Sequence, residues 1–346
     1  MAGSLSGLKT KMSKNTNLFY MKCTCHSLHL CASYSCKKLP SDVEKLCRNI
    51  YSYFAWSSKR VLELKEFQDF CDIKPHKILG LAMTRWLSLE KVICRIVEQW
   101  DALQLYFLSQ CSEVNNIKPK ESANIMLVPE IKAYTLFLTN ALKIINELNT
   151  EFQSESVRLP YLYNRLEVSV KLILCNFCQT PYIKNKNIKD IVLKDKNHFL
   201  PVANICIGTK AQQYIDSENL SEFEKCKIKE TIREFYIELI SQIKMRFDFE
   251  REDLKLLEAI TPAKFLSEDE LSIVPLMKTF ENLYNGDPDD LISQWNQLRL
   301  SLNEGKEKDI CKFFGLDEPL FKSLIEFIYN LMSLPHSFAA AERNFF

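Results

Sequence analysis

The sequence predicts a mainly α-helical fold, on three observations. Glycine is scarce, with 7 in 346 residues against roughly 7% in average usage, which disfavours sheet-rich folds with tight turns and glycine-rich phosphate loops. Apolar residues recur at helical spacing over long stretches of the chain. Ser-x-x-Glu sequences at Ser41 and Ser267 have the form of the capping box that opens a helix.

The composition narrows the class of protein. Hydrophobic residues make up 47% of the chain and charged residues 26%, as in soluble globular proteins. The formal net charge of +1 is lower than that of a typical free-standing nucleic-acid-binding domain. No apolar run reaches the ~18 residues of a membrane span, and the N-terminus lacks the apolar stretch of a signal peptide. We therefore expect an intracellular protein without a membrane partner, whose 13 cysteines stay reduced.

The individual elements follow from the apolar stripes. One short strand is expected at 18–23, which is rich in strand-forming residues. The proline-containing segment 112–130 and the charged segment 182–198 are expected to be loops. The segment 334–346 has the composition of the first turns of a helix. Helices are expected at 41–54, 61–71, 89–107, 131–152, 162–177, 223–247, 288–302 and 320–332.

The densest group of metal-ligating residue types lies in KCTCHSLHLCASYSC, 22–36. Thiolate and imidazole bind zinc, and the Cys-x-x-His spacing of Cys23 and His26 could place two ligands on one ion. The other close pair, Cys175 and Cys178, lies in an apolar run and fits two small core residues one helical turn apart. The alternative for Cys23 and His26 is a strand-to-helix corner, in which the His caps backbone groups and the Cys packs inside. We favour this structural motif and expect no bound metal.

Arg85 and Trp86 form the second candidate site. A cation beside a flat π surface can hold phosphate and stack a base, so nucleic-acid contact is one interpretation. An interior Trp with an Arg that reaches the surface or pairs with a carboxylate is the other, and it is favoured for this pair taken alone. Beyond these residues, the sequence contains no Walker loop, HExxH, GxSxG or dinucleotide-binding motif.

Four segments, taken in order, resemble one family. They are CTCHSLHLCA, LPSDVEKLCRNIYSYFAWSSKR, KILGLAMTRWLSLEKVICRIVEQWDAL and LPHSFAAAERNFF. Each is weak alone, but together they make the chain similar to hAT-superfamily transposases, and among these to the zinc-finger-associated, domesticated group. The resemblance implies a ribonuclease-H-like core interrupted by a large helical insertion. We therefore expect a mainly α fold with an incomplete core remnant in 1–88, a helical insertion domain in 89–320, and the start of a C-terminal catalytic and dimerisation segment in 321–346.

The resemblance also implies roles for individual residues. In the family, two Asp and one Glu hold two Mg²⁺ ions, which activate water and then a DNA 3′-hydroxyl. Glu342 corresponds to the Glu, Cys23 and His26 to a Cys-x-x-His element beside the second Asp, and Arg85 and Trp86 to an element near the DNA end. Both Asp residues would precede the chain, and the dimerisation segment would continue beyond it.

The function expected from this resemblance is that of a transposase-derived fragment, truncated at both ends and catalytically inactive. A single carboxylate cannot hold two Mg²⁺ ions, because their charge requires several converging oxygens, so no cofactor is expected. Partners implied are DNA, a second copy or a related transposase-like protein, and the implied location is the nucleus. Two alternatives stay open: a small helical scaffold that binds protein or nucleic acid, and a subunit that completes an acidic site with residues from another chain.

Overall fold

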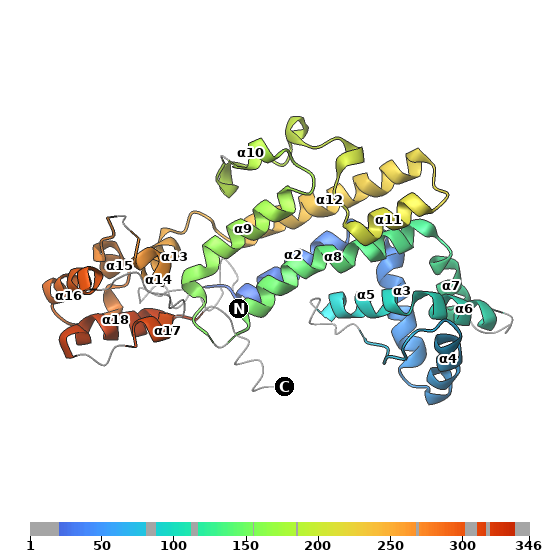
Figure 1. Ribbon diagram of the computed structural model, residues 1–346, viewed down its shortest axis with the longest axis horizontal. Coiled ribbons are helices and arrows are strands. Elements are labelled where there is room, and N and C mark those ends of the chain that lie inside the picture. Colours follow the sequence, from blue (N-terminus) through green and yellow to red (C-terminus); the bar gives the residue numbers. More distant parts are fainter. Residues whose placement is uncertain are drawn as a thin grey trace, which may run out of the picture. The chain divides into compact units, whose positions relative to one another are not determined.

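The computed structural model describes residues 21–80, 88–111, 117–154, 156–184, 186–267, 270–301, 310–315 and 319–335. Within these ranges the fold is helical, and its only sheet-like feature is an isolated antiparallel bridge between Cys178 and Phe199. The prediction of a mainly α protein is therefore confirmed (Figure 1). The strand expected at 18–23 is absent from its described part, because residues 21–23 lead directly into a helix. The ribonuclease-H-like remnant stays a prediction.

Contacts divide the chain into two compact units. The larger unit contains 28–150 and 164–250, and the smaller unit contains the described residues of 1–27, 151–163 and 251–346. Both units are assembled from segments that are separated in the sequence. The boundaries implied by the family resemblance, 1–88, 89–320 and 321–346, concern ancestry rather than packing and stay predictions.

The α-helices are α2 (Thr24–Cys36), α3 (Ser41–Phe54), α4 (Ser58–Phe70), α5 (Ser88–Glu98), α6 (Trp100–Gln110), α7 (Ile117–Met126), α8 (Pro129–Phe152), α9 (Leu162–Leu174), α10 (Thr180–Lys184), α11 (Thr209–Ser217), α12 (Glu222–Arg246), α13 (Glu252–Leu256), α14 (Pro262–Phe265), α15 (Val274–Thr279), α16 (Pro288–Ser301), α17 (Ile310–Phe313) and α18 (Lys322–Met332). The short 3-10 helices are η1 (Leu159–Tyr161), η2 (Ile188–Asp190), η3 (Lys196–His198), η4 (Val202–Asn204), η5 (Leu257–Ile260), η6 (Glu281–Leu283) and η7 (Pro319–Phe321).

In the larger unit, the long helices α8 and α12 lie side by side (Figure 1). Their contact is aromatic: the Phe137 ring meets the Phe235 ring edge-on at 5.1 Å and the Tyr236 ring at 5.4 Å. The apolar stripe that the sequence predicted for α12 is buried throughout, which confirms the helix and its inward face. The helix begins with a capping box between Ser221 and Glu224 that the sequence analysis missed.

A second cluster in the larger unit is formed by α3, α4, α6 and α7. All six apolar residues predicted for the α3 stripe are buried. The rings of Tyr53 and Phe54 pack against Tyr106 and Phe107 of α6 at centroid distances of 5.3 to 6.2 Å. The capping box expected at Ser41 is wrong, because Pro40 occupies the cap position and makes no side-chain hydrogen bond to the helix.

The single long helix expected at 89–107 is instead two helices, α5 and α6, separated at Gln99. The Gln99 side chain is fully buried. Its Oε1 accepts a hydrogen bond from Gln68 Nε2 at 2.6 Å, and its Nε2 donates to the Lys74 carbonyl at 3.1 Å. A buried amide without partners is costly, and both polar atoms of this side chain are satisfied at the point where α5 ends and α6 begins.

The two loop predictions had different outcomes. The segment 112–130 contains α7, which was missed because Pro119 was taken as a helix breaker; it lies in the first turn, where a missing N–H costs little. The segment 182–198 is only partly a loop, because it contains the end of α10 and the single turns η2 and η3. Lys244 of α12 anchors it by donating to the carbonyls of Lys189 and Ile191 at 3.0 and 2.7 Å. Burial lowers the pKa of Lys244, although the charge of Asp190 opposes this shift.

The smaller unit is organised around α16, whose start at Pro288 confirms the sequence prediction. Trp295 is buried against the Phe265 ring at 4.7 Å, and its indole Nε1 donates to the Leu271 carbonyl at 2.9 Å. One turn further, the Arg299 guanidinium donates to three carbonyls, those of Phe265, Ser267 and Leu271, at 3.1, 2.8 and 3.2 Å. These bonds hold the connection after α14 against α16. The second expected capping box, at Ser267, does not open a helix there, since α15 begins at Val274.

We expect Arg299→Lys to lower the free energy of unfolding by about 2 kcal/mol or more. A Lys ammonium keeps the charge but cannot reach three carbonyls with a planar fork, and buried carbonyls left without donors are costly. Urea unfolding followed by circular dichroism measures the change. The matched control is Arg158→Lys in the same unit, where the guanidinium donates to the Ser154 hydroxyl at 3.5 Å and lies 4.0 Å from Glu151. Equal losses in both variants would contradict the assigned role.

Candidate interaction groove and thiol pocket

Only two of the residues singled out from the sequence as candidate sites lie in the described part of the chain. Cys23 precedes α2, and its carbonyl accepts the Ser27 amide at 3.0 Å. His26 lies in the first turn of α2 and is exposed. The two residues thus lie together at a helix start, Cys23 is half-buried, and the structural role expected for the pair stays a prediction. Arg85, Trp86 and Glu342 lie outside the described residues.

The cysteine arrangement does not form an evident metal centre. Among the described residues, no three His, Cys, Asp or Glu side chains are grouped closely enough to hold an ion. The prediction that Cys175 and Cys178 are both core residues is correct only for Cys178, because α9 ends at Leu174 and Cys175 is exposed in the turn that follows.

Of the helices in the described ranges, none is both long and apolar enough to cross a membrane.

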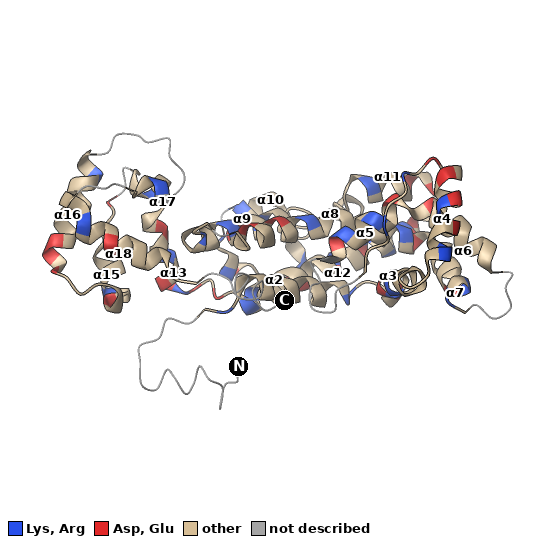
Figure 2. Cartoon of the chain, turned by 90° about the horizontal axis from the view of Figure 1, so that it is seen from below, with Lys and Arg blue, Asp and Glu red and all other residues tan. Residues whose placement is uncertain are grey.

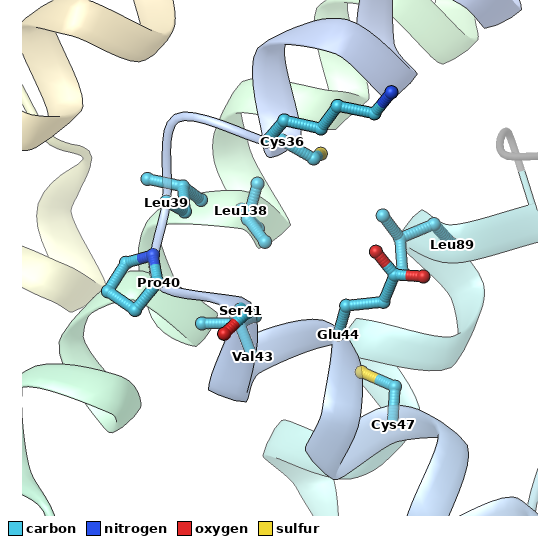
Figure 3. Close-up of a pocket in the computed structure, with 10 residues that line it drawn as sticks. Cys36, Leu39, Pro40, Ser41, Val43, Glu44, Cys47, Leu89 and Leu138 are labelled. Atoms are coloured by element: carbon cyan, nitrogen blue, oxygen red, sulfur yellow. The ribbon is translucent and has the colours of Figure 1, made fainter.

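A small pocket of about 170 Å³ lies where the α2–α3 connection meets the starts of α3 and α5 and the middle of α8. Figure 3 shows its lining, which is mainly aliphatic but includes the thiols of Cys36 and Cys47 and the carboxylate of Glu44. The Glu44 carboxylate is engaged by the Arg48 guanidinium, with Nε and Nη2 at 2.8 and 2.6 Å from the same oxygen.

The thiols of this pocket are poor nucleophiles. Desolvation raises the pKa of Cys47 to about 12, and it also raises the pKa of Cys36; the negative charge of Glu44 adds to both shifts. Because the thiolate is the reactive form, catalytic cysteines have a lowered pKa instead. Cys36 and Cys47 therefore act as small packing groups, and this pocket offers no activated nucleophile.

The larger concavity is a groove of about 860 Å³, which we call the α3–α4 groove. It runs between the end of α3, the first three turns of α4 and the extended segment 75–78. The residues that line it are Tyr51, Phe54, Ala55, Trp56, Ser57, Ser58, Val61, Leu62, Leu64, Lys65, Gln68, Pro75, His76, Lys77 and Ile78.

The apolar side chains of the α3–α4 groove are unusually open to solvent. Trp56 is 93% exposed, Leu62 66% and Val61 50%. Val61 belongs to a stripe that the sequence predicted as core, so that prediction is wrong for this residue. Contiguous exposed apolar surface on a soluble domain marks interaction sites, and Trp is the residue type most enriched among binding hot spots.

The groove is held open by contacts on its outer side. The Ser57 hydroxyl caps α4 by accepting the Arg60 amide at 3.4 Å, which fixes the turn that carries Trp56. The Arg60 guanidinium lies 4.0 Å from the Tyr53 ring centroid and donates to the Tyr53 carbonyl at 3.0 Å. The opposite wall is anchored through its backbone: the Lys74 carbonyl accepts a hydrogen bond from Gln99 Nε2, and the Lys77 carbonyl accepts one from Arg95 Nη1.

Charged residues are interspersed over the surface rather than gathered on one face of the helices (Figure 2). Within the α3–α4 groove the balance is different: Lys65 and Lys77 line it, with His76 beside them, and no acidic side chain does so among the described residues. The sequence analysis did not single out this groove. The sequence feature that could have indicated the groove is a tryptophan that directly precedes a Ser N-cap and lies between two amphipathic helices.

Comparisons of the chain with protein families, curated proteins and solved structures find no match.

The buried thiols should react slowly in the native protein. We expect a disulfide reagent at about pH 8 to modify Cys175, Cys206 and Cys226, which are exposed, well before Cys31 and Cys47, because burial both shields the latter and raises their pKa. Mass spectrometry of peptides after timed quenching measures the order. Modification of Cys47 at the rate of Cys226 would contradict the assignment of the thiol pocket as inert.

The same shifts predict a loss of stability in alkali. Above the ordinary thiol pKa of 9.0, the unfolded chain loses its thiol protons, whereas the buried thiols of the folded state keep theirs. The free energy of unfolding therefore falls as the pH rises above that value. Buried Tyr236, whose pKa burial also raises, adds a loss of the same sign above 10.0. Urea unfolding at a series of pH values measures the slope, which should be shallower between these two values in Cys47→Ala than in the native chain.

Proposed function

We propose that this chain is a transposase-derived helical protein that acts by binding another macromolecule rather than by cutting DNA. The observation that carries the proposal is the α3–α4 groove, with an almost fully exposed Trp56 and flanking aliphatic side chains. Burying apolar surface is favourable, and an apolar patch that stays exposed on a folded protein is typical of an interaction site.

The ancestry part of the proposal is supported by the order of four sequence segments, not by any single motif. By that resemblance Glu342 is the one member of the acidic triad present in the chain, and it could not hold two Mg²⁺ ions alone. A binding role needs no such triad. Under this proposal DNA, a second copy or a related transposase-like protein are possible partners, and the nucleus is the location that the resemblance favours.

The proposal predicts that the purified chain neither nicks nor joins DNA. With Mg²⁺ or Mn²⁺ and a supercoiled plasmid, we expect no conversion above the level of a protein-free reaction, and no difference between the native chain and Glu342→Ala. Gel electrophoresis of the plasmid forms measures this. Cleavage that disappears in Glu342→Ala would refute the binding-only function, because it would show that the residue belongs to a working acidic site.

A further inference from the structure

We propose that the α3–α4 groove binds an acidic amphipathic peptide segment of a partner protein, with a large apolar side chain packed against Trp56 and carboxylates facing Lys65 and Lys77. This inference rests on the proposed function, since it names the class of partner for a protein that acts by binding.

The shape and chemistry of the walls favour peptide side chains. The volume of about 860 Å³ lies within the range of roughly 300–1,000 Å³ that is usual for ligand sites, and it accommodates more than one side chain. Val61, Leu62 and Leu64 supply one aliphatic wall, and Pro75 and Ile78 supply the other. Peptide-binding grooves present such aliphatic walls to the apolar face of a helix or strand.

The same walls are poorly suited to nucleic acid. Single strands bind by stacking successive bases on successive aromatic faces. Here Trp56 is 93% exposed, whereas Tyr51 is only 40% exposed and Gly80 lies against its ring, where an added Cβ would lie 2.5 Å away. Arg60, which could otherwise meet a phosphate, lies over the Tyr53 ring and donates to the backbone. Among the described residues of the groove, Trp56 is therefore the one aromatic ring that is almost fully open for stacking.

The charge of the lining decides the kind of peptide. Lys65 and Lys77 are exposed, and within the described residues neither ammonium group forms an ion pair with a carboxylate. The nearby Glu63 of α4 is engaged elsewhere, accepting a hydrogen bond from the Tyr106 hydroxyl at 3.0 Å and pairing with Lys59 at 3.7 Å. Complementary charge favours an acidic segment. A second copy docked by two-fold symmetry would instead bring like-charged grooves together.

The test measures the binding of fluorescein-labelled probes to the full chain by fluorescence anisotropy. The probes are a peptide with Leu and Phe on one helical face and Glu on the other, the same peptide with Lys in place of Glu, and an oligothymidylate. The groove variants are Trp56→Ala and the double variant Lys65→Glu/Lys77→Glu. The matched controls are Phe223→Ala, a 76% exposed aromatic residue of α12, and Lys227→Glu on the same helix.

We expect the acidic peptide to bind and the Lys peptide to bind more weakly. Trp56→Ala should weaken acidic-peptide binding about ten-fold or more, as for a hot-spot residue. The double variant should also weaken it, and added salt should no longer lower the affinity, because the salt then screens a repulsion between carboxylates. The controls should stay within about two-fold of the native chain, and all variants should keep the native circular dichroism, because the altered side chains are exposed.

Three results would overturn the proposal: no binding of the acidic peptide or binding unaffected by Trp56→Ala; oligothymidylate binding that requires Trp56; or a dimer in sedimentation that Trp56→Ala converts to a monomer. The last two would assign the groove to nucleic acid or to a second copy. These binding results do not affect the plasmid assay. The peptide proposal can therefore be refuted while the absence of DNA cleavage still holds, and the two outcomes are distinguishable.

Discussion

The structure depends on side-chain donors that satisfy the carbonyl groups of its irregular connections. A helical chain pairs its own backbone within helices, but every connection leaves carbonyls that need partners when they are buried. Arg299 serves three of them in the smaller unit, and Lys244 serves two in the larger one. Gln99 does the same for the segment that forms one wall of the α3–α4 groove. The segment that forms this wall of the groove is therefore held by a buried polar side chain and not by apolar packing alone.

The helices beside the groove are anchored by buried contacts, whereas Trp56 is exposed to solvent. The aromatic cluster of Tyr53, Phe54 and Tyr106 fixes α3 against α6, and the Ser57 cap fixes the start of α4. Trp56 lies on the short turn between these two anchored points. A large apolar side chain on a well-supported turn loses little conformational freedom on binding, which is the condition under which a single residue contributes most to affinity. The thiols of the smaller pocket, by contrast, are protonated and inert.

The sequence predicted the helices where one apolar stripe matched one helix, as in α3, α12 and α16. It did not predict the division of 89–107 into α5 and α6 at Gln99, because hydrophobic periodicity indicates which residues are buried and not the hydrogen-bond partners of a buried amide. It also failed for Val61, since a helical stripe cannot distinguish a core face from an open groove. Of the candidate site residues, Cys23 and His26 could be placed at a helix start. The groove, in contrast, is lined by Trp56 and by the segment 75–78, which only the fold brings together.

The division of each unit among distant segments has a consequence for synthesis on the ribosome. All segments of the larger unit have been translated once Glu250 has emerged, whereas the smaller unit needs residues from 251 onward to join the short segment 151–163. Until then, Leu159 and its neighbours, which are buried in the finished protein, have no completed core to enter. Nascent chains of this kind expose apolar surface for as long as translation takes to supply the remaining helices, and they are the ones that chaperones engage.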